Sequence, residues 1–450
     1  MIEVLQLIVW LIVIWLCGSS VLTLIFRRLS PLFSIEHTAL AYPIGLGLIS
    51  IEMFLCSLMG IKFQLLVITL PWVVVWIAAF FQHMQNTPMP KQETLTVVER
   101  CFILGIAIQI VYVFFTALLE PIMAFDAVMN HAIKAKIFFL EGGVPVDFVE
   151  RFREFLFAVQ YPLLLPLAET FFYLFFGGVE DGLVKIIFPL FYVSMLVIFY
   201  CGLIRCVTRK KALLFTFLLA TVPQFAEYAT NGYAEFLISF YFTASALYLL
   251  QWGRDQRKGL LLISFILISL ALWTKVEGLI LFAVNGIVML TLIFSQKNNK
   301  KSGWMYILGL IIGAVGYLLA INMLNINLHD NSTQFVVRDF LGEVFSRIGR
   351  LPTILDQYQM QIFGPKKWNL IWVVVAILFF VNIKRVFNKH LLPVTVLVLS
   401  LTLGYMMIYF LTIDAYEWVL EKSLSRLMIH HVAIVTFYSA LLFKEANLDV

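Results

Sequence analysis

The stretch from Glu120 to Gly143 is the first long polar interruption in an otherwise apolar chain. If it forms a helix, Asp126, Asn130 and Lys134 stand at i, i+4 and i+8 and share one face. His131 lies one step further round the same helix. A carboxylate, an amide, an imidazole and an amine together can bind a polar ligand, and the carboxylate can accept a proton. An ordinary solvated helix lying on the bilayer is the alternative interpretation.

A second candidate acid, Glu235, stands at the start of an apolar segment, close to Asn231 and Tyr233. A carboxylate in that position must face water or a partner, because lipid would leave its charge unsolvated. It could instead be an interfacial acid that is favoured by a helix N-terminus. Glu227 competes with it for any acidic role.

Lys275 and Glu277 form a third polar group, two residues apart between apolar runs. Two charges there cannot face lipid at reasonable cost. They are either a structural ion pair or a clamp for phosphate and hydroxyl groups.

A fourth group lies in the stretch 334–350, where an apolar stripe is accompanied by Arg338, Arg347 and Arg350. This pattern is typical of a helix on the membrane surface, where arginines can bind a lipid phosphate bidentately. Nonspecific contact with anionic headgroups is an equal alternative. Weaker candidates for the same role occur near the start of the last apolar segment: Arg426, His430 and His431.

The composition defines the class of protein that holds these residues. Of 450 residues, 62% are hydrophobic and 13% are charged, and the mean hydropathy is +0.93. Apolar runs of spanning length recur along the chain, which predicts an all-α polytopic bundle of about 13 transmembrane helices. The net charge of +5 comes from basic connectors, so it indicates topology and not nucleic-acid binding. The five cysteines show neither metal-site spacing nor a disulfide framework.

The basic connectors decide the expected topology. The segment 160–177 is apolar enough to span, but it contains two prolines and Glu169. Counting it as a span would place every later basic connector outside, against the positive-inside rule. We therefore expect an interfacial or half-buried helix there, with the N-terminus outside and the C-terminus inside. The expected spans are 4–26, 37–59, 63–83, 101–119, 183–204, 212–226, 233–251, 260–274, 277–294, 304–323, 368–383, 391–413 and 428–443.

Two of the expected spans, 212–226 and 260–274, are too short for a hydrocarbon core of roughly 30 Å. Their outer ends should border a water-filled cavity, roofed by the loop that carries Asp126. The regions expected on the outer side are the loop 120–182, the turns 224–235 and 274–278, and the loop 325–367.

The polar groups occur in an order that resembles the GT-C superfamily of integral-membrane glycosyltransferases, near glycosyltransferase family 39 and the oligosaccharide-transferase-like members. FDAVMNHAIKAKIFF resembles the aspartate-bearing first outer loop of these enzymes, which include dolichyl-phosphate-mannose mannosyltransferases. YPLLLPLAETFFYLFFGG is similar to their juxtamembrane segment, with Tyr161 where a histidine is often found. ATNGYAEFLISFYF resembles their second acidic turn, and LWTKVEGLILF resembles the TKxEG element of bacterial members.

The resemblance covers residues of about 100 to 295 and implies a domain organisation. It predicts N-terminal accessory helices in 1–99, a GT-C-like catalytic module in 100–295, and C-terminal helices in 296–450. It also implies a multi-pass protein, most simply of a bacterial inner membrane, with the active site facing the periplasm. Membrane lipids surround such a protein, and no nucleic acid is implied.

The activity implied by the resemblance is transfer of a sugar from a polyprenyl-phosphate donor to a glycan, lipid or protein acceptor. Asp126 would then be the catalytic acidic residue and Glu235 a second one, while phosphate would be held by a Lys or Arg. Members differ in their need for a divalent cation, so the metal stays open, and no other cofactor is implied. The expected substrate-binding residues are Asn130, His131, Lys134, Tyr161, Asn231, Lys275, Glu277, Arg338 and Arg347.

Two other classes remain open. A transporter or flippase would place ionisable groups near the bilayer midplane and would often show inverted repeats, whereas here they lie near the outer ends of spans. A polymerase or ligase of surface polysaccharide would have long outer loops rich in Arg late in the chain, which fits 325–367. The sequence shows no Walker motif, zinc-spaced set or nucleophile elbow.

Overall fold

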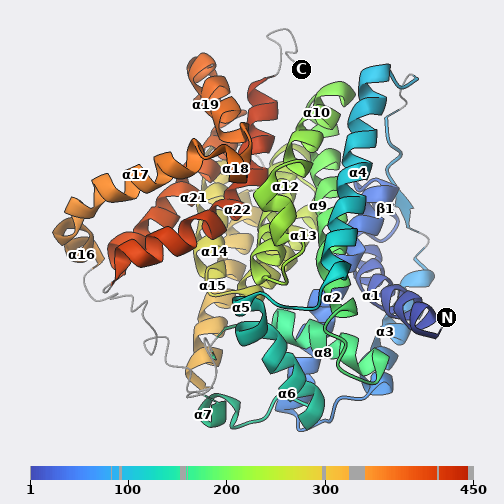
Figure 1. The fold of residues 1–450 in the computed structure, drawn as a ribbon. Helices are drawn as coiled ribbons and strands as arrows, with labels where there is room; N and C mark the ends of the chain where they lie inside the picture. Colours follow the sequence, from blue (N-terminus) through green and yellow to red (C-terminus); the bar gives the residue numbers. More distant parts are fainter. Residues whose placement is uncertain are drawn as a thin grey trace.

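The computed structural model describes residues 2–82, 84–90, 94–152, 159, 161–295, 300–323, 340–412 and 415–443. Within these ranges the chain is almost entirely helical (Figure 1), and one small parallel sheet pairs β1 (Leu29–Ser30) with β2 (Gln85–Asn86). Nine of the described helices are long and apolar enough to cross a membrane, and four shorter apolar helices accompany them. The expected all-α bundle with several membrane-spanning helices is confirmed, while the exact number of spans stays a prediction.

The first four apolar helices, of which the third is shorter than the others, form one side of the bundle. α1 and α2 cross closely because glycines remove the side chains at their contact: a Cβ on Gly18 would lie 1.9 Å from the Ala41 carbonyl oxygen. The same clash would occur between Gly45 and Ile14. Small residues at such crossings are typical of membrane helices. The helices are α1 (Ile2–Phe26), α2 (Ser34–Leu58), α3 (Leu65–Phe80) and α4 (Val97–Leu119).

The chain after α4 leaves one end of the bundle and returns to it. The Ile122 amide donates to the Asp181 carbonyl at 3.1 Å, and Lys185 Nζ donates to the Glu120 carbonyl at 3.0 Å. The short helices between these points gather at the lower end of Figure 1. They are α5 (Phe125–Ala127), the π-helix η1 (Val128–Ala132), α6 (Ile133–Glu141), α7 (Phe148–Phe152), α8 (Leu164–Phe176) and the 3₁₀-helix η2 (Leu183–Ile186).

α8 contains most of the segment whose crossing was in question. It has 13 residues, so its length of about 20 Å is too short for a bilayer core. Every residue from Leu164 to Tyr173 is buried, because α8 packs between α2 and α6. The segment therefore does not have to cross, and its place relative to the bilayer stays a prediction. α8 is enclosed by protein, so it is more deeply buried than the interfacial or half-buried helix that we expected.

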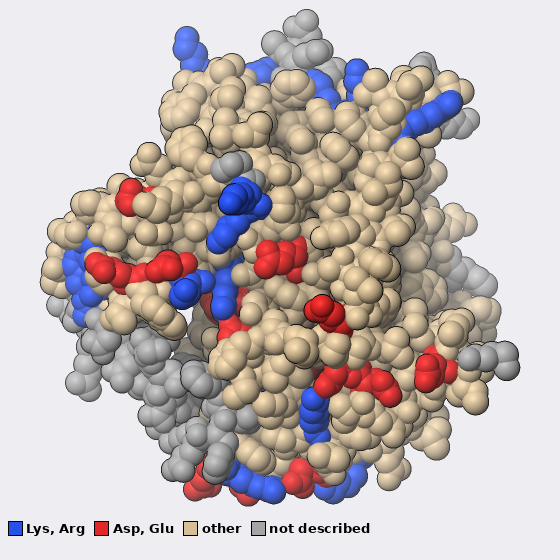
Figure 2. All heavy atoms as spheres, viewed as in Figure 1, with Lys and Arg blue, Asp and Glu red and all other residues tan. Residues whose placement is uncertain are grey.

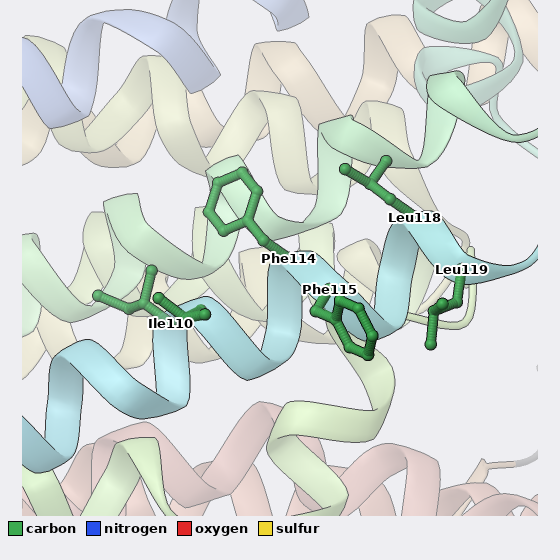
Figure 3. Close-up of a pocket in the computed structure, with 6 residues that line it drawn as sticks. Ile110, Phe114, Phe115, Leu118 and Leu119 are labelled. Atoms are coloured by element: carbon green, nitrogen blue, oxygen red, sulfur yellow. The ribbon is translucent and has the colours of Figure 1, made fainter.

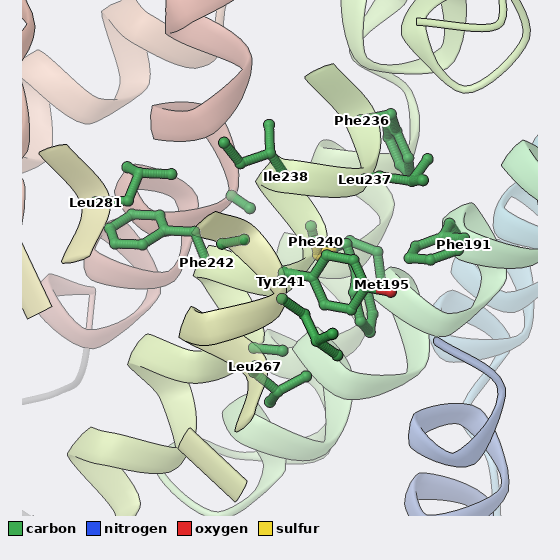
Figure 4. Packing of buried hydrophobic residues seen from close by; sticks show 14 of the residues in the cluster. Phe191, Met195, Phe236, Leu237, Ile238, Phe240, Tyr241, Phe242, Leu267 and Leu281 are labelled. Carbon is green, nitrogen blue, oxygen red and sulfur yellow. The ribbon is translucent and has the colours of Figure 1, made fainter. Parts of the chain in front are cut away.

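α12 is the central helix, and its neighbours cover it on all sides (Figure 4). Phe191 of α9 packs edge-on against Phe240 and Tyr241 of α12, with ring centroids 5.3 and 5.5 Å apart. The expected span 212–226 is wrong as one helix, because a break precedes Pro223, which begins a new helix. The helices are α9 (Ile187–Ile204), α10 (Arg209–Ala220), α11 (Pro223–Tyr228), α12 (Ala234–Asp255), α13 (Lys258–Thr274), α14 (Gly278–Ser295) and α15 (Lys300–Met323).

The C-terminal part adds two long helices and several short ones. α22 returns to the middle of the bundle and packs against α12, so the end of the chain contributes to the centre. The elements are α16 (Phe340–Ser346), the 3₁₀-helix η3 (Ile348–Arg350), α17 (Leu351–Ile362), α18 (Pro365–Trp368), α19 (Ile371–Val381), α20 (Ile383–Val386), α21 (Leu392–Leu411) and α22 (Tyr416–Leu442).

Several basic connectors meet at the end of the bundle opposite to α5–α8. Arg205 pairs with Glu36 at 2.5 Å, and the Arg254 guanidinium donates to the Arg205 carbonyl at 3.3 Å. Arg209 pairs with Glu99 at 2.7 Å. On the face drawn in Figure 2, Lys and Arg are the charged side chains seen at this upper end, whereas Asp and Glu appear lower. The connector with Arg205 and Arg209 and the connector with Arg254 therefore lie at the same end of the bundle, while the parity of all the spans stays a prediction.

Candidate functional site

Asp126 is held at the start of α12 by close packing of two turns. Gly232 adopts φ +86°, and a Cβ there would lie 3.1 Å from the Ala127 Cβ. A side chain at 232 would therefore meet both a strained backbone and a neighbour. This contact brings the short helix α5 against the turn that leads to Glu235.

The regular helix expected for residues 126–134 is wrong, because Val128–Ala132 form a π-helix. A π-helical turn closes its hydrogen bonds from residue i to i+5, so the rotation between Asp126 and Asn130 differs from that of a regular α-helix. Asp126 keeps part of its side chain in solvent, while Asn130 and Lys134 are buried. π-helical turns are rare and occur frequently at functional sites.

Arg426 of α22 forms an ion pair with Asp126, and we call these two residues the outer pair. Arg426 Nη1 also lies 3.8 Å from Glu235 Oε1, and its guanidinium lies 5.3 Å from the centroid of the Tyr233 ring. Arg426 therefore joins the outer loop to the start of the central helix.

Glu235 and Lys275 form a second ion pair, which we call the inner pair. Lys275 Nζ lies 3.0 Å from Glu235 Oε1 and 2.8 Å from Glu277 Oε1. The lysine occupies the turn between α13 and α14. α13 has only 17 residues, or about 26 Å, so this turn can lie below the membrane surface, as the short expected span predicts.

The two pairs differ in their access to solvent. The side chains of the outer pair are 29% (Arg426) and 25% (Asp126) exposed. Those of the inner pair are 7% (Lys275) and 4% (Glu235) exposed. The cluster is thus open on the side of Asp126 and closed on the side of Lys275.

Tyr161 lies between two cations of the cluster. The ammonium groups of Lys134 and Lys275 lie 5.9 and 5.8 Å from the centroid of its ring, within the range of cation–π attraction. Lys134 Nζ also donates to the Val159 carbonyl at 3.4 Å. The Tyr161 ring therefore separates Lys134 from the inner pair.

Burial changes the protonation of the outer-loop residues beside the cluster. Desolvation lowers the pKa of Lys134 to about 7 and raises the pKa of Tyr161 to about 12. Desolvation, and then the charge of Lys134, lowers the pKa of His131 to about 3. At neutral pH, His131 is therefore an uncharged imidazole that can accept or donate a hydrogen bond.

Three buried polar atoms of this region have no hydrogen-bond partner among the described residues. They are Asn130 Oδ1, His131 Nδ1 and Glu277 Oε2. A buried polar atom without a partner costs about 1–3 kcal/mol, so each needs an explanation. A polar ligand or water in the cluster would supply their partners.

Other predicted site residues lie elsewhere or have local roles. Arg347 donates to the Phe410 and Leu411 carbonyls at 3.1 Å, so it binds the C-terminal end of α21, where helix carbonyls lack partners. Asn231 Oδ1 accepts from the Tyr233 amide at 3.0 Å and shapes the turn before α12. Arg338 lies outside the described residues.

Arg426 is the residue whose importance the sequence understates. It lies 300 positions from Asp126, and nothing in the sequence indicates that α22 packs beside α5. The available signal is a charged residue inside a long apolar helix, which generally marks a functional or paired position.

An apolar groove lies on the half of α4 that leads to the outer loop (Figure 3). Its volume is about 470 Å³. It ends beside Leu119, next to the loop that carries Asp126. The lining residues are Ile110, Val111, Phe114, Phe115, Leu118 and Leu119.

Comparison with protein families, with curated proteins and with solved structures finds no match to this chain. Within the described ranges, no group of three or more His, Cys, Asp or Glu side chains is placed to hold a metal ion. The fold and the cluster define a multi-pass helical membrane protein with a buried ionic site that opens at one end of the bundle.

Proposed function

We propose that the protein is a membrane glycosyltransferase, similar to the GT-C superfamily, that takes a sugar from a polyprenyl-phosphate donor. The observation that carries this proposal is the outer pair: a carboxylate and a guanidinium meet at the open side of a buried ionic cluster. A carboxylate can take the proton of an acceptor hydroxyl, and a guanidinium can hold a phosphate. These are the two groups that sugar transfer from a phosphodiester needs.

The proposed reaction needs only the donor, the acceptor and the charged side chains of the cluster. The acceptor hydroxyl oxygen attacks the anomeric carbon, and its proton passes to Asp126. The bond between the anomeric carbon and the phosphate oxygen breaks, and polyprenyl phosphate leaves with the electron pair. Arg426 stabilises the negative charge that grows on the leaving phosphate. Glu235 and Lys275 hold Arg426 and the α13–α14 turn in place.

The apolar groove on α4 supports a donor with a lipid tail. It is lined by apolar side chains and leads to the loop that carries Asp126. A prenyl chain in this groove would lie in the hydrocarbon layer and would bring its phosphate towards the outer pair. Because the prenyl chain of the donor lies inside the membrane, an enzyme that uses this donor needs a site that transmembrane helices can reach.

The orientation that we propose follows from the basic connectors. They lie at the end opposite to the short helices α5–α8 (Figure 1), and such connectors favour the cytoplasmic side. The outer pair would then face the periplasm or the cell exterior. A bacterial inner membrane is the simplest location for this arrangement.

The test uses the full-length protein purified in detergent. It is mixed with a panel of short-chain polyprenyl-phosphate monosaccharides and with a membrane extract, from cells lacking the protein, as the source of acceptor. Release of polyprenyl phosphate reports transfer for every sugar. We expect Asp126→Asn to fold and to lower the release on the order of 10²-fold.

Asp181→Asn is the matched control, because Asp181 pairs with Lys136 in the same loop at 28% exposure. Its release rate should stay near that of the wild type. Absence of release from every donor, or an Asp126→Asn rate near the wild-type rate, would overturn the proposed function. A flippase would move the lipid without breaking the bond to the sugar.

A further inference from the structure

We infer that Arg426 exchanges Asp126 for the donor phosphate, so that donor binding sets the base free and must precede acceptor binding. This inference rests on the proposed function and adds an order of events to it. In the ligand-free protein the Asp126 carboxylate is occupied by Arg426. The Asp126 oxygen that accepts from the guanidinium is not available to accept from an acceptor hydroxyl.

Arg426 is the cation of the cluster best placed for such an exchange. Lys275 already holds two carboxylates, at 3.0 and 2.8 Å, and its side chain is only 7% exposed. Arg426 is 29% exposed and faces the open side. Its planar guanidinium can also bind a phosphate through two parallel hydrogen bonds, which an ammonium cannot do.

The exchange leaves no buried charge without a partner. When Arg426 turns to a phosphate, Glu235 keeps Lys275 at 3.0 Å. Asp126 is 25% exposed, so its released carboxylate stays in contact with water. Breaking a fully buried pair costs far more free energy than opening a partly exposed one. The outer pair can therefore open and the inner pair stays closed.

Repulsion between the two anions drives the separation. A phosphodiester that binds Arg426 brings a negative charge next to the Asp126 carboxylate, and like charges at a few ångströms repel. The Asp126 carboxylate then turns away from Arg426 towards the solvent-exposed side of the cluster, where it can take the proton of an acceptor hydroxyl. An acceptor that arrived first would find the carboxylate still bound by Arg426.

The exchange predicts opposite effects of one substitution. Asp126→Asn removes the competitor for Arg426, so phosphate should bind more tightly although transfer is lost. A carboxylate that only supports the structure would give no gain in phosphate affinity. This difference separates the exchange from a static ion pair.

The experiment measures binding of farnesyl phosphate to the full-length protein in detergent, with inorganic phosphate as a second probe. We expect Asp126→Asn to lower the Kd for farnesyl phosphate by about 1.5- to 5-fold, the range that corresponds to an exposed ion pair. Arg426→Gln should raise the Kd at least about tenfold. Arg426→Lys serves if the glutamine variant does not fold, and it should bind weakly because it lacks the bidentate geometry.

Asp181→Asn is again the matched control, because it frees Lys136 in the same loop at 34% exposure. Its Kd should equal that of the wild type. An unchanged or weaker affinity of Asp126→Asn, or an equal gain in Asp181→Asn, would overturn the exchange. The same pattern with inorganic phosphate would assign the subsite to phosphate alone, and its restriction to farnesyl phosphate would add a role for the prenyl chain.

The binding of farnesyl phosphate can be measured without sugar transfer. The proposed exchange and the proposed transferase activity can therefore be rejected independently of each other. The expected binding pattern without release of polyprenyl phosphate from any donor would retain the exchange and reject the transferase. Sugar transfer by a protein whose Asp126→Asn variant binds phosphate no better than the wild type would retain the transferase and reject the exchange.

Discussion

Glu235 and Lys275 form a buried ion pair 3.0 Å long at the closed side of the site. Both side chains are less than a tenth exposed, and the lysine holds Glu277 as well, at 2.8 Å. The pair ties the start of the central helix α12 to the turn between α13 and α14. It therefore has a structural role in addition to any role in binding.

Removal of Lys275 should destabilise the fold strongly. Lys275→Met leaves two carboxylates without their cation, and we expect a loss of about 3–5 kcal/mol in the free energy of unfolding. The double variant Lys275→Met/Glu235→Gln should recover much of this loss, because it also removes the charge of Glu235, the more deeply buried of the two carboxylates that Lys275 holds. Thermal unfolding in detergent measures both.

Lys422→Met is the matched control for this prediction, because it removes a lysine from an ion pair on the surface. Lys422 lies 3.6 Å from Glu421, and both side chains are more than half exposed. Its unfolding temperature should stay near that of the wild type, since surface pairs contribute little. Equal losses in both lysine variants, or no recovery in the double variant, would contradict a structural inner pair.

The sequence indicated the ionisable residues of the site because charges near the ends of apolar runs are costly in lipid. This cost identifies Asp126, Glu235 and Lys275 as candidate site residues. Arg426 is a weaker candidate from the sequence, because no local pattern shows which distant helix packs beside α5. The π-helix η1 was also missed, since a helix of ordinary geometry was assumed.

The contacts of Arg347 depend on tertiary packing that the sequence does not show. An apolar stripe with arginines predicts a helix on the membrane surface whose arginines bind a lipid phosphate. In the structure, Arg347 donates to carbonyls at the end of α21, and its contact with a phosphate stays a prediction. The unpaired carbonyls of a helix end compete for the same guanidinium donors, and their position depends on tertiary packing.

The topology predicts opposite labelling of two exposed positions. Val146 lies between α6 and α7 and is 97% exposed, while Arg257 lies in the exposed connector between α12 and α13. In a cysteine-free background, which removes the exposed Cys101, Val146→Cys should react with an impermeant maleimide from outside intact bacterial cells. Arg257→Cys should react only after the cells are opened.

The labelling experiment distinguishes an error in the number of spans between the two positions from an error in the orientation of the whole protein. Reaction of both positions from the same side would contradict the parity of the spans and the return of the chain through α8. Reaction from the two sides in reversed order would keep the fold and overturn the proposed outward orientation of the site.

Lys134 should make the stability of the protein depend on pH. Burial lowers its pKa from the ordinary 10.5 to about 7. Between these values the unfolded chain binds one more proton than the folded chain, so stability rises with pH across this window. The slope from one group is at most about 1.4 kcal/mol per pH unit. Below pH 7 both states carry the proton, so the cost of burying the charge is present in full.

The measurement compares wild type with Lys134→Met, whose unbranched apolar side chain can fill the same buried space. Thermal unfolding in detergent between pH 7 and pH 10 should show the variant more stable at pH 7. Its advantage should shrink as the pH rises, because the free-energy cost of removing the proton from the buried wild-type lysine falls as the pH approaches the ordinary value of 10.5. Thr170→Val is the control: Thr170 Oγ1 donates to the Ala135 carbonyl at 3.2 Å in the same helix contact. That variant should show a constant offset, since threonine does not titrate. A constant offset for Lys134→Met as well would show that Lys134 keeps its charge inside the fold.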